Sequence, residues 1–249
     1  MNVVITGVSS GFGYEMAKVF AKAGHTVIGI ARRQDRLEAI RTELGECFHG
    51  FELDVSDRVK AESVVAEIMA EFGHVDVLVN NAGLALGLES AHEAKFDDWQ
   101  TMIQTNVLGL VSLTQLFLPY MTERNDGYVI NMGSTAGNWP YSGGNVYGAT
   151  KAFVKQFSLN LRADLFGKNI RVTNVEPGLC GETEFSNIRF KGDDDKAAAL
   201  YQNAQPVTGK DIADIVFWLA NQPKHINVNR IEVMPTSQTF GGLKVHYAE

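Results

Sequence analysis

The sequence predicts an α/β protein built on a doubly wound, mostly parallel sheet of seven strands flanked by helices. Strand-like and helix-like segments alternate from residue 1 to residue 234 without a linker, so we expect residues 1–249 to form a single domain. A glycine-rich turn at residues 6–13 joins the first strand to the first helix. Polar motifs follow the ends of later strands, at the edge where such sheets bind ligands.

The individual elements follow from the period of the apolar residues. Short unbroken apolar runs predict buried parallel strands, and apolar residues three and four positions apart predict helices. We expect strands near residues 3–6, 26–31, 48–55, 75–80, 128–134, 170–176 and 230–234. Helices are expected near residues 14–23, 34–44, 58–72, 99–121, 146–165 and 209–220. Right-handed crossovers between these strands give the doubly wound sheet.

The turn after the first strand has the composition of a dinucleotide-binding loop. Gly7 permits a tight turn, Gly11 lets a phosphate approach the backbone, and Gly13 lets the helix pack closely on the strand. The N–H groups at the start of the helix then face the pyrophosphate. The predicted contacts are Gly7, Val8, Ser9, Ser10, Gly11, Phe12 and Gly13.

The residues after the second strand indicate which dinucleotide is bound. An NAD enzyme places an acid here, about 20 residues after the glycines, to bind the ribose 2′-hydroxyl. This chain has Arg32 and Arg33 instead, with no acid before Asp35. Guanidinium groups bind a 2′-phosphate by charge-assisted hydrogen bonds. The pair therefore favours NADP(H), although two arginines that simply cap a loop are the alternative.

Tyr147 and Lys151 carry the signal for catalysis. They are four residues apart near the start of a predicted helix, and so share one face. A free phenol has a pKa of about 10, and a nearby cation lowers it. With Ser134 to hold the oxygen on which charge develops, the three predict proton transfer to or from an alcohol/carbonyl pair. Ordinary helix surface is the alternative for an isolated pair.

Together, these motifs resemble the short-chain dehydrogenase/reductase family, and the resemblance implies a Rossmann fold. The family's catalytic tetrad corresponds to Asn106, Ser134, Tyr147 and Lys151, with Asn106 holding a water in a proton relay toward the lysine. Its Asn-Asn-Ala-Gly motif begins at Asn80. The resemblance implies further NADP contacts from Asp54, Val55, Asn81, Ala82, Gly83, Tyr147, Lys151, Pro177, Gly178, Leu179 and Thr183.

Several longer stretches resemble one branch of that family, the NADP-dependent 3-hydroxy acid dehydrogenases. They are residues 80–87, 139–141, 143–153, 176–179, 183–187 and 189–194. This branch, which includes serine 3-dehydrogenase and allo-threonine dehydrogenase, oxidises the hydroxyl of L-serine, L-allo-threonine or 3-hydroxypropionate, or reduces the corresponding semialdehyde. An NADPH-dependent sulfoacetaldehyde reductase, which forms isethionate, has overlapping motifs. The alternative outside catalysis is an NADP-sensing regulator, a class that usually lacks the tyrosine or the lysine.

The substrate site is expected under a mobile lid formed by residues 179–201. A small anionic hydroxy acid or aldehyde needs a local cation, and Arg189 is the candidate for binding its carboxylate in a bidentate pair. Lys191 and Arg230 are weaker candidates, and a solvated lid arginine is the alternative. Ser134, Tyr147 and Asn145 complete the predicted substrate site.

The composition excludes other classes of function. The net charge of −7 argues against nucleic-acid binding. No unbroken apolar run reaches about 18 residues, so we expect no membrane span. Two cysteines and a start that lacks a basic segment are typical of a cytoplasmic protein. The six histidines show no ligand spacing, and no metal site is expected.

Two helices predict an assembly of several copies. The apolar surfaces of residues 105–121 and 146–165 are broad for helices with one solvated face. The family resemblance implies that they pack between subunits of a homotetramer. The tail, residues 235–249, keeps Phe240, Leu243 and Tyr247, and we expect it to pack against a neighbouring subunit.

Overall fold

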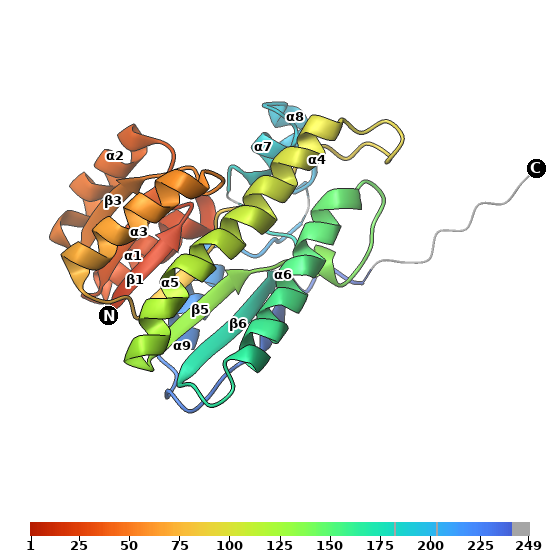
Figure 1. Ribbon diagram of the computed structural model, residues 1–249. Helices are drawn as coiled ribbons and strands as arrows, with labels where there is room; N and C mark the ends of the chain where they lie inside the picture. Colours follow the sequence, from red (N-terminus) through yellow and green to blue (C-terminus); the bar gives the residue numbers. More distant parts are fainter. Residues whose placement is uncertain (182, 203, 241–249) are drawn as a thin grey trace, which may run out of the picture.

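The computed structural model, which describes residues 1–181, 183–202 and 204–240, is built around one seven-stranded sheet (Figure 1). The strands are Asn2–Thr6 (β1), Thr26–Ala31 (β2), Phe48–Glu52 (β3), Val77–Asn80 (β4), Gly127–Met132 (β5), Ile170–Pro177 (β6) and Arg230–Val233 (β7). Their order is β3-β2-β1-β4-β5-β6-β7. Every neighbouring pair is parallel. The predicted fold class is confirmed, and the strand order reverses between β1 and β4, where ligands bind in such sheets.

Helices cover both faces of this sheet. They are Gly11–Lys22 (α1), Gln34–Leu44 (α2), Arg58–Phe72 (α3), Phe96–Ile103 (α4), Leu110–Arg124 (α5), Asn145–Asp164 (α6), Phe185–Arg189 (α7), Asp194–Ala199 (α8) and Gly209–Ala220 (α9). Buried residues of α1, α2 and α9 pack on one face, and those of α3, α5 and α6 pack on the other. Figure 1 shows α4, α7 and α8 gathered beyond the arrowheads of β1 and β5. The short helices α7 and α8 were not predicted.

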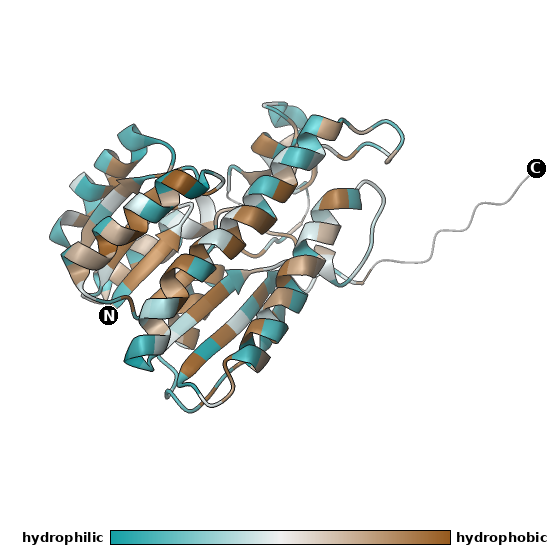
Figure 2. Ribbon diagram, in the orientation of Figure 1, coloured by the Kyte–Doolittle hydropathy of each residue, from teal (hydrophilic) through white to brown (hydrophobic). Residues whose placement is uncertain are grey.

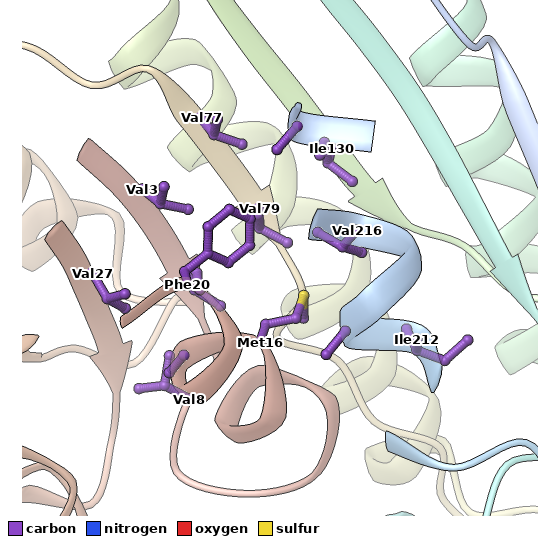
Figure 3. Packing of buried hydrophobic residues seen from close by; sticks show 14 of the residues in the cluster. Val3, Val8, Met16, Phe20, Val27, Val77, Val79, Ile130, Ile212 and Val216 are labelled. Carbon is purple, nitrogen blue, oxygen red and sulfur yellow. The ribbon is translucent and has the colours of Figure 1, made fainter. Parts of the chain in front are cut away.

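The core follows from the alternation of side chains along each strand. Val3 belongs to the cluster with α1 and α9, and its neighbour Val4 belongs to the cluster with α3 and α5. Figure 3 shows Met16 and Phe20 of α1 packed between the strands and Val216 of α9. Hydrophobic residues, brown in Figure 2, occur on the strands and alternate with hydrophilic, teal residues on the helices that cover them. Each large side chain fully buried in this way contributes roughly 1.5–3 kcal/mol.

The helix expected at residues 99–121 is longer and less regular than predicted. A π turn, Gln104–Gly109, joins α4 to α5. Asn106 in this turn accepts a hydrogen bond from the Leu84 amide at 2.9 Å and donates one to the Leu84 carbonyl at 2.8 Å. A side chain that binds a neighbouring loop on both sides draws the helix toward that loop, and π turns of this kind are frequent at functional sites.

The combined run Phe96–Arg124 is 29 residues long and, by length and composition alone, could cross a membrane. Polar residues interrupt this run, so it contains no unbroken apolar stretch of the length expected for a membrane span. Its residues Leu113, Phe117 and Met121 are buried in the core against the sheet. A core helix of a globular protein can have the same length and composition, so these two properties are weak evidence for a membrane span.

Candidate active site

A cleft of about 870 Å³ lies at the carboxyl ends of the strands. The predicted site residues that line it are Gly7, Ser9, Ser10, Gly11, Phe12, Arg32, Arg33, Asp54, Val55, Asn81, Ala82, Gly83, Ser134, Tyr147, Lys151, Pro177, Gly178, Leu179, Thr183 and Arg189. Val8, Gly13, Asn106 and Asn145 lie outside the lining. The motifs that are far apart in the sequence therefore share one continuous wall.

The glycine turn has the shape of a phosphate cradle. Gly7 and Gly11 adopt φ values of +73° and +55°, which favour glycine. A Cβ atom on Gly13 would lie 2.3 Å from the Gly7 carbonyl oxygen, so only glycine fits there. Ser10, the N-cap residue of α1, makes no side-chain capping bond. The first N–H groups of the helix are thus available to an anion, and the cradle fits a dinucleotide pyrophosphate.

Thr6 fixes the Asn-Asn-Ala-Gly loop against this cradle. Its hydroxyl oxygen accepts hydrogen bonds from the amides of Asn81 and Ala82, at 2.9 and 2.8 Å. The side chain of Asn81 donates in return to the Thr6 carbonyl at 2.8 Å. Two loops that follow β1 and β4 are therefore locked together at the reversal of strand order, where the middle of a dinucleotide would lie.

The two arginines line the cleft, Arg33 beside Ser9 of the glycine turn, and both have acidic neighbours. Arg33 Nη2 lies 3.0 Å from Glu184 Oε2 and donates to Ser9 Oγ at 3.0 Å. Arg32 Nη1 lies 3.7 Å from Asp54 Oδ2 and is two-thirds exposed, with 67% of its side chain accessible. Both guanidinium groups line the cleft, where a 2′-phosphate would bind. Arg33 also pairs with Glu184 of the expected lid. This pair was not predicted from the sequence.

Tyr147 and Lys151 project from the first turns of α6, and Ser134 follows β5. Lys151 Nζ donates to the Met132 carbonyl at 2.8 Å and lies 5.8 Å from the centroid of the Tyr147 ring. Tyr147 and Lys151 are both buried, with 8% and 7% exposed. Ser134 Oγ accepts a hydrogen bond from the Ala136 amide at 3.1 Å, which fixes the serine rotamer. The structure thus brings the predicted triad together.

Burial controls the protonation of both groups. It raises the pKa of the Tyr147 phenol above its usual value, and the lowering effects of the Ser134 hydrogen bond and of Arg189 do not cancel it. Burial also lowers the pKa of Lys151 to about 8. The expectation that Lys151 brings down the pKa of Tyr147 is therefore wrong for the free protein. The ammonium group points to the Met132 carbonyl, and desolvation acts more strongly on the phenol.

Asn106 supports the site from behind. Its side chain is 1% exposed, and besides its two bonds to Leu84 it donates to Thr150 Oγ1 at 3.1 Å. Its Oδ1 atom would lie 3.2 Å from a Cβ atom on Gly83. The amide thus holds the loop after β4 against α6. The water contact that the family resemblance implies for Asn106 stays a prediction.

The lid places one buried cation over the triad. Arg189 is 9% exposed, its Nε donates to the Gly87 carbonyl at 3.1 Å and its Nη2 donates to the Tyr141 hydroxyl at 2.8 Å. Its Cζ atom lies 5.7 Å from the centroid of the Tyr147 ring. A solvated lid arginine is therefore not what the structure shows. The role of Tyr141 as a partner of Arg189 was not predicted from the sequence.

Three further candidates for substrate contacts, Lys191, Arg230 and Asn145, bond to other groups of the protein. Lys191 pairs with Asp98 at 2.7 Å, and Arg230 pairs with Glu176 at 2.7 Å. Asn145 donates to a backbone carbonyl, that of Glu89, at 3.2 Å. In the parts of the chain that the structure describes, no group of three or more His, Cys, Asp or Glu side chains could hold a metal.

The first residues of the tail close the cleft near Pro177. Gln238 Oε1 accepts a hydrogen bond from the Leu179 amide at 2.7 Å, and the Phe240 ring lies 4.5 Å from the Trp139 ring, centroid to centroid. These contacts are within the chain, whereas the apolar residues of the tail were interpreted as a signal for packing on a neighbouring subunit. Leu243 and Tyr247 lie outside the described residues, so the expected contact with a neighbouring subunit stays a prediction.

The fold and this site define a class: the chain belongs to the short-chain dehydrogenase family, whose sequence pattern matches residues 1–193. The NADP-dependent 3-hydroxy acid dehydrogenase YdfG of Salmonella typhi is 55% identical over 246 residues, which are 99% of each chain. Serine 3-dehydrogenase of Agrobacterium fabrum is 48% identical, over 98% of this chain and 97% of its own. Among solved structures, the closed form of serine dehydrogenase complexed with NADP+ gives a TM-score of 0.98 at 54% identity, over 100% of both chains. The predicted family is confirmed.

Proposed function

We propose that this protein is an NADP-dependent oxidoreductase that interconverts a short 3-hydroxy acid and its 3-oxo acid or semialdehyde. The observation that carries the proposal is Arg189, a buried guanidinium 5.7 Å from the ring centroid of Tyr147. This distance suits a substrate with a carboxylate and a hydroxyl separated by a short carbon chain. Arg189 would bind the carboxylate, and Tyr147 would bind the hydroxyl. Relatives named as 3-hydroxy acid and serine dehydrogenases, at 48–55% identity, support the same substrate class.

The cleft holds the groups that the cofactor requires. The glycine turn and the start of α1 would hold the pyrophosphate, and Arg32 and Arg33 would hold the 2′-phosphate. Lys151 and the loops at Asn81 and Pro177 would contact the nicotinamide half. When bound, NADP(H) accepts or supplies the hydride.

The protein itself handles the proton and the developing charge. Burial keeps Tyr147 in its phenol form. In reduction the phenol donates its proton to the carbonyl oxygen and becomes phenolate, and in oxidation the phenolate takes the proton of the substrate hydroxyl. The Ser134 hydroxyl, which donates to the Pro177 carbonyl in the free protein, would turn its proton to the same oxygen as charge develops there. Lys151 provides a cation whose pKa of about 8 lets it exchange a proton near neutral pH. Asn106 positions the loop and helix that meet behind them.

Initial rates test this proposal directly. NADP with L-serine, L-allo-threonine and 3-hydroxypropionate should be compared with NADPH plus malonic semialdehyde or sulfoacetaldehyde, with NAD(H) as control. The proposal expects rates with the hydroxy acids or malonic semialdehyde that depend on NADP(H). A dominant rate with sulfoacetaldehyde would replace the substrate class. NADPH binding without turnover of any compound would favour the regulator.

The proposed working form is a cytoplasmic homotetramer. Leu108, close to the start of α5, is 56% exposed, and Phe153 on α6 is 42% exposed. Phe153 stacks on Phe157, with ring centroids 5.9 Å apart, so the two apolar rings lie side by side on α6. Contiguous apolar surface of this kind is typical of subunit interfaces. Light scattering of the purified protein measures the assembly.

A further inference from the structure

We propose that Glu176 is a positioning residue for the catalytic centre, acting on Ser134 through Asn138. The inference rests on the proposed function, because it assumes that Ser134 binds the reacting oxygen. Glu176 lies at the end of β6, directly before Pro177, and only 1% of its side chain is exposed. A carboxylate this deeply buried needs a strong reason in the structure, since burying a charge is costly unless it is paired.

Four donors converge on this carboxylate. Oε1 accepts hydrogen bonds from Asn174 Nδ2 at 2.6 Å and from Arg230 Nε at 2.9 Å. Oε2 accepts from Arg230 Nη2 at 2.7 Å and from Asn138 Nδ2 at 2.7 Å. The Arg230 pair is bidentate and neutralises the charge. The carboxylate therefore joins β7 to Asn138, the residue that ends the short turn after Ser134.

Asn138 carries this connection to the catalytic helix. It follows the short helical turn Thr135–Gly137, which starts directly after Ser134. Its Nδ2 also donates to Glu232 Oε1 at 3.1 Å, and its Oδ1 accepts from Lys155 Nζ at 2.9 Å. Lys155 is on α6, one turn beyond Lys151. One side-chain amide thus holds the turn, two strands and α6 in a single arrangement.

The position of the Ser134 hydroxyl depends on this arrangement. Its Oγ donates to the Pro177 carbonyl at 3.3 Å and accepts from the Ala136 amide at 3.1 Å. The first partner directly follows Glu176, and the second lies in the turn that Asn138 ends. A shift of the turn would therefore move Oγ relative to Tyr147. A misplacement of about 1 Å in a catalytic group costs up to about 10²-fold in rate.

A neutral amide cannot replace this carboxylate. All four partners donate, and a glutamine side chain offers one accepting oxygen and one donating NH2 group. If the NH2 group replaced Oε2, it would face the donors of Asn138 and Arg230. If it replaced Oε1, it would face the donors of Asn174 and Arg230. Asn174 Oδ1 is buried and has no hydrogen-bond partner among the described residues. Reversal of this amide would still leave Arg230 Nε against a donor. The position therefore demands a group that only accepts hydrogen bonds.

Glu176→Gln, Glu176→Asp and Asn138→Ala test the inference in steady-state kinetics. Glu176→Gln should lower kcat by about tenfold or more, with the Kd for NADPH unchanged, because the turn moves but the phosphate cradle does not. Glu176→Asp keeps the charge and all acceptors on a shorter stem, so it should recover part of the loss. Asn138→Ala breaks the same link without unpairing the buried charge, and decides the question if Glu176→Gln does not fold.

Glu62→Gln is the matched control. Glu62 accepts a single hydrogen bond from Arg58 at 2.9 Å on the exposed face of α3, so Glu62→Gln removes a glutamate–arginine pair at a residue that does not line the cleft. Its kcat should equal that of the wild-type protein. Wild-type kcat in Glu176→Gln, or in Asn138→Ala where the first variant does not fold, overturns the inference.

Hydrogen exchange gives a readout that does not depend on turnover. The amides of Gly137, Asn138 and Trp139 donate to carbonyls of Ser134 and Thr135 at 2.9–3.0 Å. In Glu176→Gln or Asn138→Ala they should exchange about tenfold faster, while the amides of β1 keep wild-type rates. Unchanged exchange in this turn overturns the inference. If the wild-type protein turns over no substrate, the proposed function fails, and the exchange rates still decide whether Glu176 positions this turn.

Discussion

Lys151→Met should make the protein more stable while it abolishes turnover. The free lysine has a pKa of 10.5, and burial lowers that of Lys151 to about 8. At about 1.4 kcal/mol for each pKa unit, the charged side chain costs the folded state about 3 kcal/mol at pH 7. Methionine fills the same space without charge. It loses the hydrogen bond to the Met132 carbonyl, worth about 1 kcal/mol, so the net gain is about 2 kcal/mol.

The gain depends on pH in a defined direction. Below pH 8 the lysine is protonated in both the folded and the unfolded chain, so its cost is fully present. Between pH 8 and 10.5 only the unfolded chain keeps the proton, and the stability of the wild-type protein rises with pH. The advantage of Lys151→Met should therefore shrink over this range, and above it the lost hydrogen bond should leave the variant slightly less stable.

Urea denaturation of the cofactor-free proteins at pH 7 and pH 10, at one fixed protein concentration, measures this difference. Lys168→Met is the control, because Lys168 is exposed and its charge costs the folded state nothing by burial. A loss of stability in Lys151→Met at pH 7, or a difference that does not change with pH, would refute the reasoning that burial sets the charge of Lys151.

Three further variants test other parts of the structure. Arg33→Ala should raise the KM for NADPH by about 10–100-fold and leave that for NADH nearly unchanged, since a charged hydrogen bond is worth about 1.5–3 kcal/mol; equal effects on both cofactors in steady-state kinetics would contradict this role. Gly13→Ala places a Cβ atom 2.3 Å from the Gly7 carbonyl oxygen, so fluorescence titration should show loss of NADPH binding, and wild-type affinity would exclude a tight cradle. Phe153→Glu buries a charge in the proposed interface, so light scattering should show smaller species, and an unchanged mass would place the interface elsewhere.

The fold could be predicted because its determinants are local. The period of the apolar residues and the glycines at residues 6–13 depend on short stretches of sequence, and each strand was expected close to its observed position. The family motifs then placed the predicted cofactor contacts along one sheet edge. The π turn at Asn106 could not be foreseen, because it depends on two hydrogen bonds to Leu84, which is 22 residues away.

The parts of the site that were missed depend on contacts between distant residues. Glu184 meets Arg33 across 151 positions, and Glu176 meets Arg230 across 54. Such pairs exist only once the chain has folded. The same reason explains the wrong expectation for the pKa of Tyr147. The spacing of Tyr147 and Lys151 indicates that they are neighbours, but the depth of burial that determines the pKa depends on the lid and on the loop around Tyr141.

Tyr147→Phe provides the most direct test of the proposed chemistry. The oxidation rate of 3-hydroxypropionate with NADP should be measured together with NADPH binding for the wild-type protein and this variant. Because the hydroxyl transfers the proton and the ring only packs, turnover should fall by about 10²–10⁴-fold, with the affinity for NADPH retained. Turnover close to that of the wild-type protein would show that the proton passes through another group and would contradict the mechanism.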